Sequence, residues 1–86
     1  MTATEEVPAR FVLNAARELY AEAAAAHVLV PQIPAAEVAT RAGVDPHVTV
    51  KILFELRQQG LLAPLTFYRA GGGNPDSSFV HGPPTD

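Results

Sequence analysis

Residues 33–62 constrain the fold of this chain most strongly, because helix start and stop signals follow one another within this stretch. Apolar side chains at helical spacing predict a short helix over 35–42. Gly43 follows at the position where a helix end favours positive φ. Asp45 then offers an N-cap, and Pro46 suits the first position of a second helix. The stretch therefore predicts two helices joined by a tight turn, a helix–turn–helix.

The second helix is expected to run from residue 46 to about residue 59, where Gly60 stops it. We expect the hydroxyl of Thr49 to donate a hydrogen bond back to the carbonyl of Asp45. A helical projection at about 100° per residue places inward Val48, Thr49, Ile52, Leu53 and Leu56. The same projection places outward His47, Val50, Lys51, Phe54 and Gln58.

A long helix is predicted before this pair. Residues 9–27, which follow Pro8, are rich in good helix formers. Two apolar stripes run along this helix, although a small domain needs only one buried face. The first stripe consists of Val12, Ala16, Leu19, Ala23 and Ala26, and the second of Leu13, Tyr20 and Ala24. The second stripe indicates a homodimer through this helix, unless the rest of the monomer covers both stripes.

A β-hairpin is predicted after the pair. Residues 65–69 and 77–81 have the composition of two antiparallel strands. Residues 70–76, AGGGNPD, would form a flexible tip between them. Together these elements predict a mainly α fold with a small β-hairpin, of the α+β class, in a single domain. We expect residues 1–7 and 83–86 to be flexible tails of that domain.

The run AEVATRAGVDPHVTVKILFELRQQGLL resembles the core of winged helix–turn–helix regulators of the MarR and ArsR type, down to the Leu-x-x-x-Gly-Leu ending at residues 56–61. The resemblance covers roughly residues 33–80. It implies that the hairpin is the wing, that Ile33 forms a short edge strand against it, and that the partner is double-stranded DNA. The same frame occurs in dimerisation modules and protein-interaction winged helices. A winged-helix protein–protein module that does not bind DNA is therefore the alternative.

If the resemblance holds for DNA, the second helix of the pair would enter the major groove with its N-terminal half. Lys51 would contact a guanine or a phosphate, and Val50 a thymine methyl. Arginines would contact phosphates. The complete predicted DNA-binding set is His47, Val50, Lys51, Arg41, Arg57 and Arg69.

Phe54 allows three interpretations on that outward face. It is covered by the rest of the fold, it anchors a protein partner, or it contacts DNA; large apolar residues are usually buried. In the second case, the predicted protein interface comprises Leu13, Tyr20, Ala24 and Phe54.

The charge balance bears on these alternatives, because nucleic-acid affinity comes largely from neutralising phosphates. The chain has a formal net charge of −3. Residues 34–82 hold as many acidic as basic side chains, so we expect a neutral reading surface. The predicted wing tip carries Asp76 and no cation, which disfavours insertion of the tip into the minor groove.

The sequence gives no support for an enzyme, a metal site or a cofactor. It contains no cysteine, and its three histidines, His27, His47 and His81, lack the spacing of a zinc site. Residues 71–73 lack the Lys and Ser/Thr that follow a phosphate loop. No apolar run is long enough to span a membrane, and the N-terminus lacks the basic start of a signal peptide. We therefore expect a cytoplasmic, prokaryotic-type transcription regulator.

Overall fold

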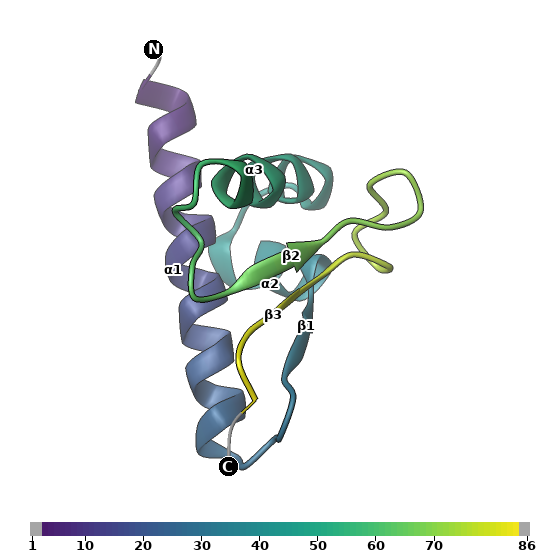
Figure 1. Cartoon of the computed structure of the whole chain (residues 1–86). Helices are drawn as coiled ribbons and strands as arrows, with labels where there is room; N and C mark the ends of the chain where they lie inside the picture. Colours follow the sequence, from purple (N-terminus) through teal and green to yellow (C-terminus); the bar gives the residue numbers. More distant parts are fainter. Residues whose placement is uncertain (1–2, 85–86) are drawn as a thin grey trace.

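Three helices and a small antiparallel sheet make up the computed structural model, which describes the backbone of residues 3–84 and the side chains of residues 8–84. In chain order the elements are α1 (Ala3–Ala25), β1 (Gln32–Pro34), α2 (Ala35–Ala42), α3 (Pro46–Gln58), β2 (Thr66–Tyr68) and β3 (Phe79–His81). Helix α1 stands along one side, α3 lies across the sheet, and the loop between β2 and β3 projects away from α1 (Figure 1). The predicted α+β class is confirmed.

The turn between α2 and α3 forms as its residues predict. Gly43 has a φ of 70°, and its N–H donates to the carbonyl of Ala39 at 2.8 Å. The carboxylate of Asp45 accepts hydrogen bonds from the backbone N–H groups of His47 at 3.0 Å and Val48 at 3.2 Å. The hydroxyl of Thr49 donates to the carbonyl of Asp45 at 2.9 Å, so this buried hydroxyl is satisfied locally.

Helix α1 extends further toward the N-terminus than predicted. It begins at Ala3, so residues 3–7, expected in the N-terminal tail, lie in the helix, while residues 1 and 2 lie outside the described part of the chain. Pro8 lies inside the helix rather than before it. A proline near the start of a helix removes only one backbone hydrogen bond, and the residues before it include good helix formers. The helix ends two residues early because His27 takes a φ of 63°.

The sheet has the strand order β1-β3-β2 and is antiparallel throughout. Its central register row, Ile33 opposite Val80 opposite Phe67, is buried. The predicted short edge strand at Ile33 is thereby confirmed. The hairpin strands are shorter than predicted, because the residues before β3 form a turn in which the N–H of Ser78 donates to the carbonyl of Asn74.

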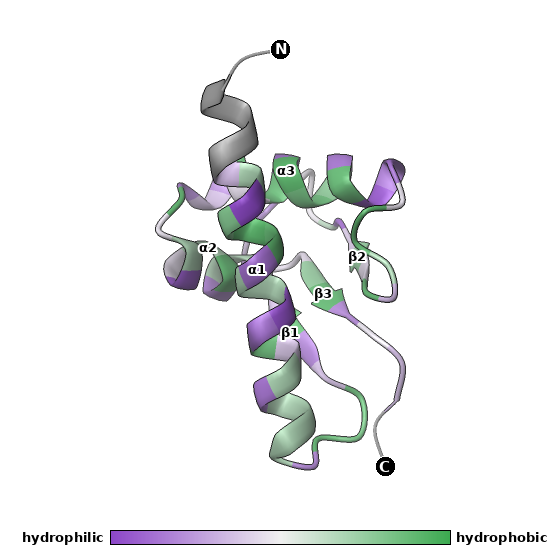
Figure 2. Cartoon of the chain, turned by 90° about the vertical axis from the view of Figure 1, so that its left-hand side faces the viewer, coloured by the Kyte–Doolittle hydropathy of each residue, from purple (hydrophilic) through white to green (hydrophobic). Residues whose placement is uncertain are grey.

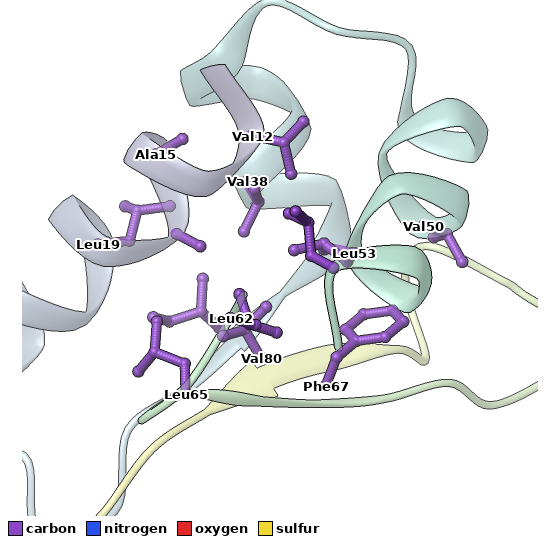
Figure 3. Packing of buried hydrophobic residues seen from close by; sticks show 14 residues of the cluster. Val12, Ala15, Leu19, Val38, Val50, Leu53, Leu62, Leu65, Phe67 and Val80 are labelled. Carbon is purple, nitrogen blue, oxygen red and sulfur yellow. The ribbon is translucent and has the colours of Figure 1, made fainter. Parts of the chain in front are cut away.

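The core lies between the three helices and the inner face of the sheet (Figure 3). Leu53 of α3 is fully buried and lies at its centre, near Leu62 and Val80. The first stripe of α1 supplies buried Val12, Ala16 and Leu19, as predicted. From the second stripe, Leu13 and Tyr20 also pack against this core. The second stripe therefore does not require a partner helix to cover these two side chains.

The predicted rotation of α3 is wrong at two valines. Val50 is only 4% exposed, whereas Val48, expected inward, is 44% exposed. The two positions lie on opposite sides of a helix, so only one can face the core. A Cβ placed on Gly73 would lie 3.7 Å from Val50 Cγ1, which shows that the loop between β2 and β3 covers Val50.

That loop, residues 69–78 between β2 and β3 and hereafter the tip, caps the start of α2. Pro34 precedes α2 and offers no side-chain cap. Instead, the N–H of Ala35 donates to the carbonyl of Ser78 at 2.9 Å, and the N–H of Ala36 to that of Pro75 at 3.2 Å. The Ser78 hydroxyl accepts from the N–H of Ala70 at 3.0 Å inside the tip. Two of the N–H groups that every helix start leaves unpaired are thus satisfied by the far end of the chain.

The segment after β3 packs against α1. The Tyr20 hydroxyl donates a hydrogen bond to the carbonyl of Pro83, within the predicted tail. A Cβ added to Gly82 would lie 2.6 Å from Tyr20 Cε1 and 2.8 Å from Leu65 Cδ2. This close approach requires glycine. Residues 85–86 lie outside the described part of the chain.

Candidate nucleic-acid interface

The outward face of α3 is the most open polar surface among the predicted sites. His47 in its first turn and Lys51 in its second are exposed, and so is Arg57 in its last turn. Val50 lies beneath the tip, so it cannot touch a thymine methyl as predicted. Glu55 is exposed as well, so this face carries both signs of charge.

Arg69 is held beside α3 by an aromatic contact. Its guanidinium carbon lies 4.8 Å from the ring centroid of Phe54, within the range of a cation–π interaction. Phe54 is half-buried and also packs against the core. Of the three interpretations of Phe54, coverage within the fold is therefore the one that these contacts favour. The ring also places a cation at the edge of the outward face of α3.

Arg41, predicted to contact phosphate, instead joins α2 to α1. Its guanidinium contacts Glu22 in a bidentate manner, at 2.8 and 2.9 Å, and Glu18 at 3.2 Å. Hydrogen bonds from Arg41 lower the pKa of the Glu22 carboxyl, and those two glutamates raise the pKa of Arg41. Because two carboxylates already neutralise it, Arg41 offers little net charge to a polyanion.

We expect the Arg41–Glu22 pair to make stability depend on pH in acid. The folded-state pKa of Glu22 lies below its usual value of 4.5. The contribution of the Glu22 carboxylate to folding stability is therefore present above that usual value and is lost as the pH falls through the folded-state pKa. Glu22→Gln should lower the melting temperature near neutral pH, and this difference should shrink as the pH falls through the folded-state pKa. Thermal unfolding followed by circular dichroism tests this; a difference that persists in acid would contradict it.

An open groove separates the tip from the start of α3. It has a volume of about 590 Å³ and is lined by Ala36, Pro46, His47, the three glycines 71–73, Asn74, Pro75 and Asp76. Asp76 is exposed, and its N–H donates to the side-chain oxygen of Asn74 at 2.8 Å. A carboxylate therefore borders the N-terminal end of the candidate reading helix. That placement opposes a phosphate in the groove.

The predicted protein-interface residues are all half-buried, namely Leu13, Tyr20, Ala24 and Phe54. The most exposed large apolar side chains of α1 and the following loop are different ones. Phe11 is 52% exposed and Leu29 is 65% exposed, with Val28 and Val30 beside it. Figure 2 shows this loop and the end of α1 as an apolar region. This apolar region could have been predicted from the sequence, because residues 23–36 contain no Asp, Glu, Lys or Arg.

Residues 3–84 contain no helix that is long and apolar enough to cross a membrane. Within the described part of the chain, no group of three or more His, Cys, Asp or Glu side chains is placed to hold a metal ion. Comparison of the chain with protein-family models, curated proteins and solved structures gave no significant match.

Proposed function

We propose that this chain is a winged-helix domain that binds double-stranded DNA and acts as a dimeric cytoplasmic transcription regulator. The observation that carries the proposal is the order of elements. A short edge strand, two helices joined by a tight turn, and a β-hairpin follow one another, and the second helix leaves its polar outward face open. An exposed helix of this kind fits the major groove, with its first turns toward the base edges.

The contact set in this proposal is smaller than the predicted one. His47 and Lys51 would face the groove, Arg57 a phosphate near the end of α3, and Arg69 a phosphate beside Phe54. Val50 is excluded by its burial, and Arg41 is engaged by glutamates. With so few cations, affinity for any single domain would be modest, and two domains on one duplex would add to it.

We expect the chain to bind random-sequence duplex DNA weakly and with strong dependence on salt. Lys51→Ala and Arg69→Ala should each weaken binding and lower the slope of log K against log salt by about 1. Arg41→Ala removes the same charge from a neutralised position and serves as the matched control, with an unchanged slope expected. Fluorescence anisotropy of a labelled duplex at low and moderate salt measures this.

Two outcomes would count against DNA binding. One is no binding even at low salt, and the other is identical slopes for Lys51→Ala, Arg69→Ala and the unaltered chain. The mass in solution, determined in parallel, tests the homodimer through α1. The exposed apolar side chains of Phe11, Val28, Leu29 and Val30 favour such self-association, or the alternative of a protein-interaction module.

A further inference from the structure

The outer face of the sheet carries six side chains in two rows, hereafter the sheet platform. The middle register row of the sheet is buried against the helices, and neighbouring residues in a strand point to opposite faces. The rows on either side of it therefore point outward. One row consists of Pro34, Phe79 and Tyr68, and the other of Gln32, His81 and Thr66.

The rings of the sheet platform form one continuous group. The ring centroids of Tyr68 and Phe79 are 5.3 Å apart, and those of Phe79 and His81 are 5.7 Å apart. Tyr68 is 56% exposed, which is high for an aromatic side chain paired with a second ring. Phe67 and Val80 belong to the middle row and face the core. The rings of the neighbouring rows therefore face away from α3. The proposed DNA contacts use none of the six residues.

The charge of the sheet platform restricts its partner. None of its six side chains carries a formal charge with histidine neutral. The nearest arginine in sequence, Arg69, lies over Phe54 of α3 on the other side of the sheet. Single-stranded nucleic acids need a cationic groove beside the stacking rings, so they fit poorly here. An uncharged ligand that offers apolar rings fits better.

The polar members of the sheet platform complement such a ligand. Gln32, Thr66, His81 and Tyr68 all have side-chain hydrogen-bond donors. A polyproline II segment has no internal hydrogen bonds, so its carbonyl groups are free to accept. Its turn of three residues rises about 9 Å, close to the distance of about 9.6 Å between the outer strands of a three-stranded sheet. Prolines one turn apart on one side would therefore lie over the two ends of the row, Tyr68 on β2 and Pro34 on β1, with the ring of Phe79 between them.

From this match we propose that the sheet platform binds a proline-rich peptide segment in the polyproline II conformation. Prolines one turn apart pack on Tyr68 and Pro34, with the ring of Phe79 between them, and the donors of the neighbouring row bind the peptide carbonyls. This activity is independent of DNA binding, because it uses the opposite face of the sheet. It would allow the domain to join a proline-rich protein while α3 remains open.

Titration of the ¹⁵N-labelled 86-residue chain with the peptide decaproline tests the proposal by NMR. We expect saturable shifts confined to β1, β2 and β3, with a dissociation constant below about 1 mM. Tyr68→Ala should weaken binding at least about tenfold, since truncation of a central aromatic contact has the largest effects in interfaces. Phe11→Ala removes a ring of similar exposure, 52%, outside the sheet platform and should change nothing.

A second variant keeps the test decisive if Tyr68→Ala does not fold. Thr66→Val keeps the shape of a half-buried strand residue but removes a donor, and we expect it to weaken binding by a few-fold. Absence of shifts at millimolar decaproline would overturn the proposal. So would equal binding of a Gly-Ser decapeptide, tighter binding of oligothymidine to the same strands, or shifts that depend only on protein concentration, which would indicate a second copy of the chain.

Discussion

Replacing Leu53 by alanine is expected to lower the free energy of unfolding by about 2–5 kcal/mol, the usual range for a buried leucine. Leu53 is fully buried and belongs to the core cluster formed by the helices and the sheet. Since a domain of this size has a total stability of only about 5–15 kcal/mol, this single change removes a large share of it. Urea unfolding followed by circular dichroism measures the difference.

Val48→Ala provides the matched control for Leu53→Ala. It removes apolar atoms from the same helix at a side chain that is 44% exposed, and alanine has the higher helix propensity. We expect a change within about 0.5 kcal/mol. If Leu53→Ala were as mild as Val48→Ala, the position of Leu53 at the centre of the core would be wrong.

Gly82→Ala is expected to destabilise the chain by about 1–3 kcal/mol, the usual range for overpacking. The added methyl carbon would meet the Tyr20 ring at 2.6 Å and Leu65 at 2.8 Å, so the segment after β3 must move away from α1. The hydrogen bond from Tyr20 to Pro83 would be lost with it. Urea unfolding of the single variant gives the magnitude.

A double-mutant cycle identifies the cause of the Gly82→Ala effect. In a Tyr20→Ala background the ring is absent, so Gly82→Ala should cost clearly less than in the unaltered chain. The remaining cost would come from Leu65. Strict additivity of the two changes would show that Gly82 does not pack against the Tyr20 ring.

Local signals in the sequence predicted the local structure well. The glycine at 43, the N-cap at Asp45 and the back-bonding of Thr49 each depend on residues within four positions of one another, and all three are confirmed. The β-rich composition of residues 65–69 and 77–81 located both strands of the hairpin, although turn bonds before β3 shortened the second. Short-range hydrogen bonds can be predicted from sequence because few other partners compete for the same donors and acceptors.

Contacts between distant residues were not predictable in the same way. The projection of α3 placed Val48 inward and Val50 outward, but Gly73 of the tip, which lies far along the chain, covers Val50 and leaves Val48 exposed. Arg41 was predicted to contact phosphate as a free cation. Its glutamate partners lie 19 and 23 residues earlier in the chain, so no local pattern indicated the ion pairs. The sheet platform needs the register of three strands, which no local pattern fixes. The proposed site lost two members for these reasons.

The cap that the tip provides for α2 has a consequence for the order in which this chain can fold. During synthesis the residues of α2 are added to the chain before Pro75 and Ser78, whose carbonyls accept from the N–H groups of Ala36 and Ala35. A fragment that stops after α3 would therefore begin α2 with unpaired donors and would lack β3, the middle strand of the sheet. We therefore expect the helix pair, although its local signals are strong, to reach its full stability only when the tip and β3 are in place.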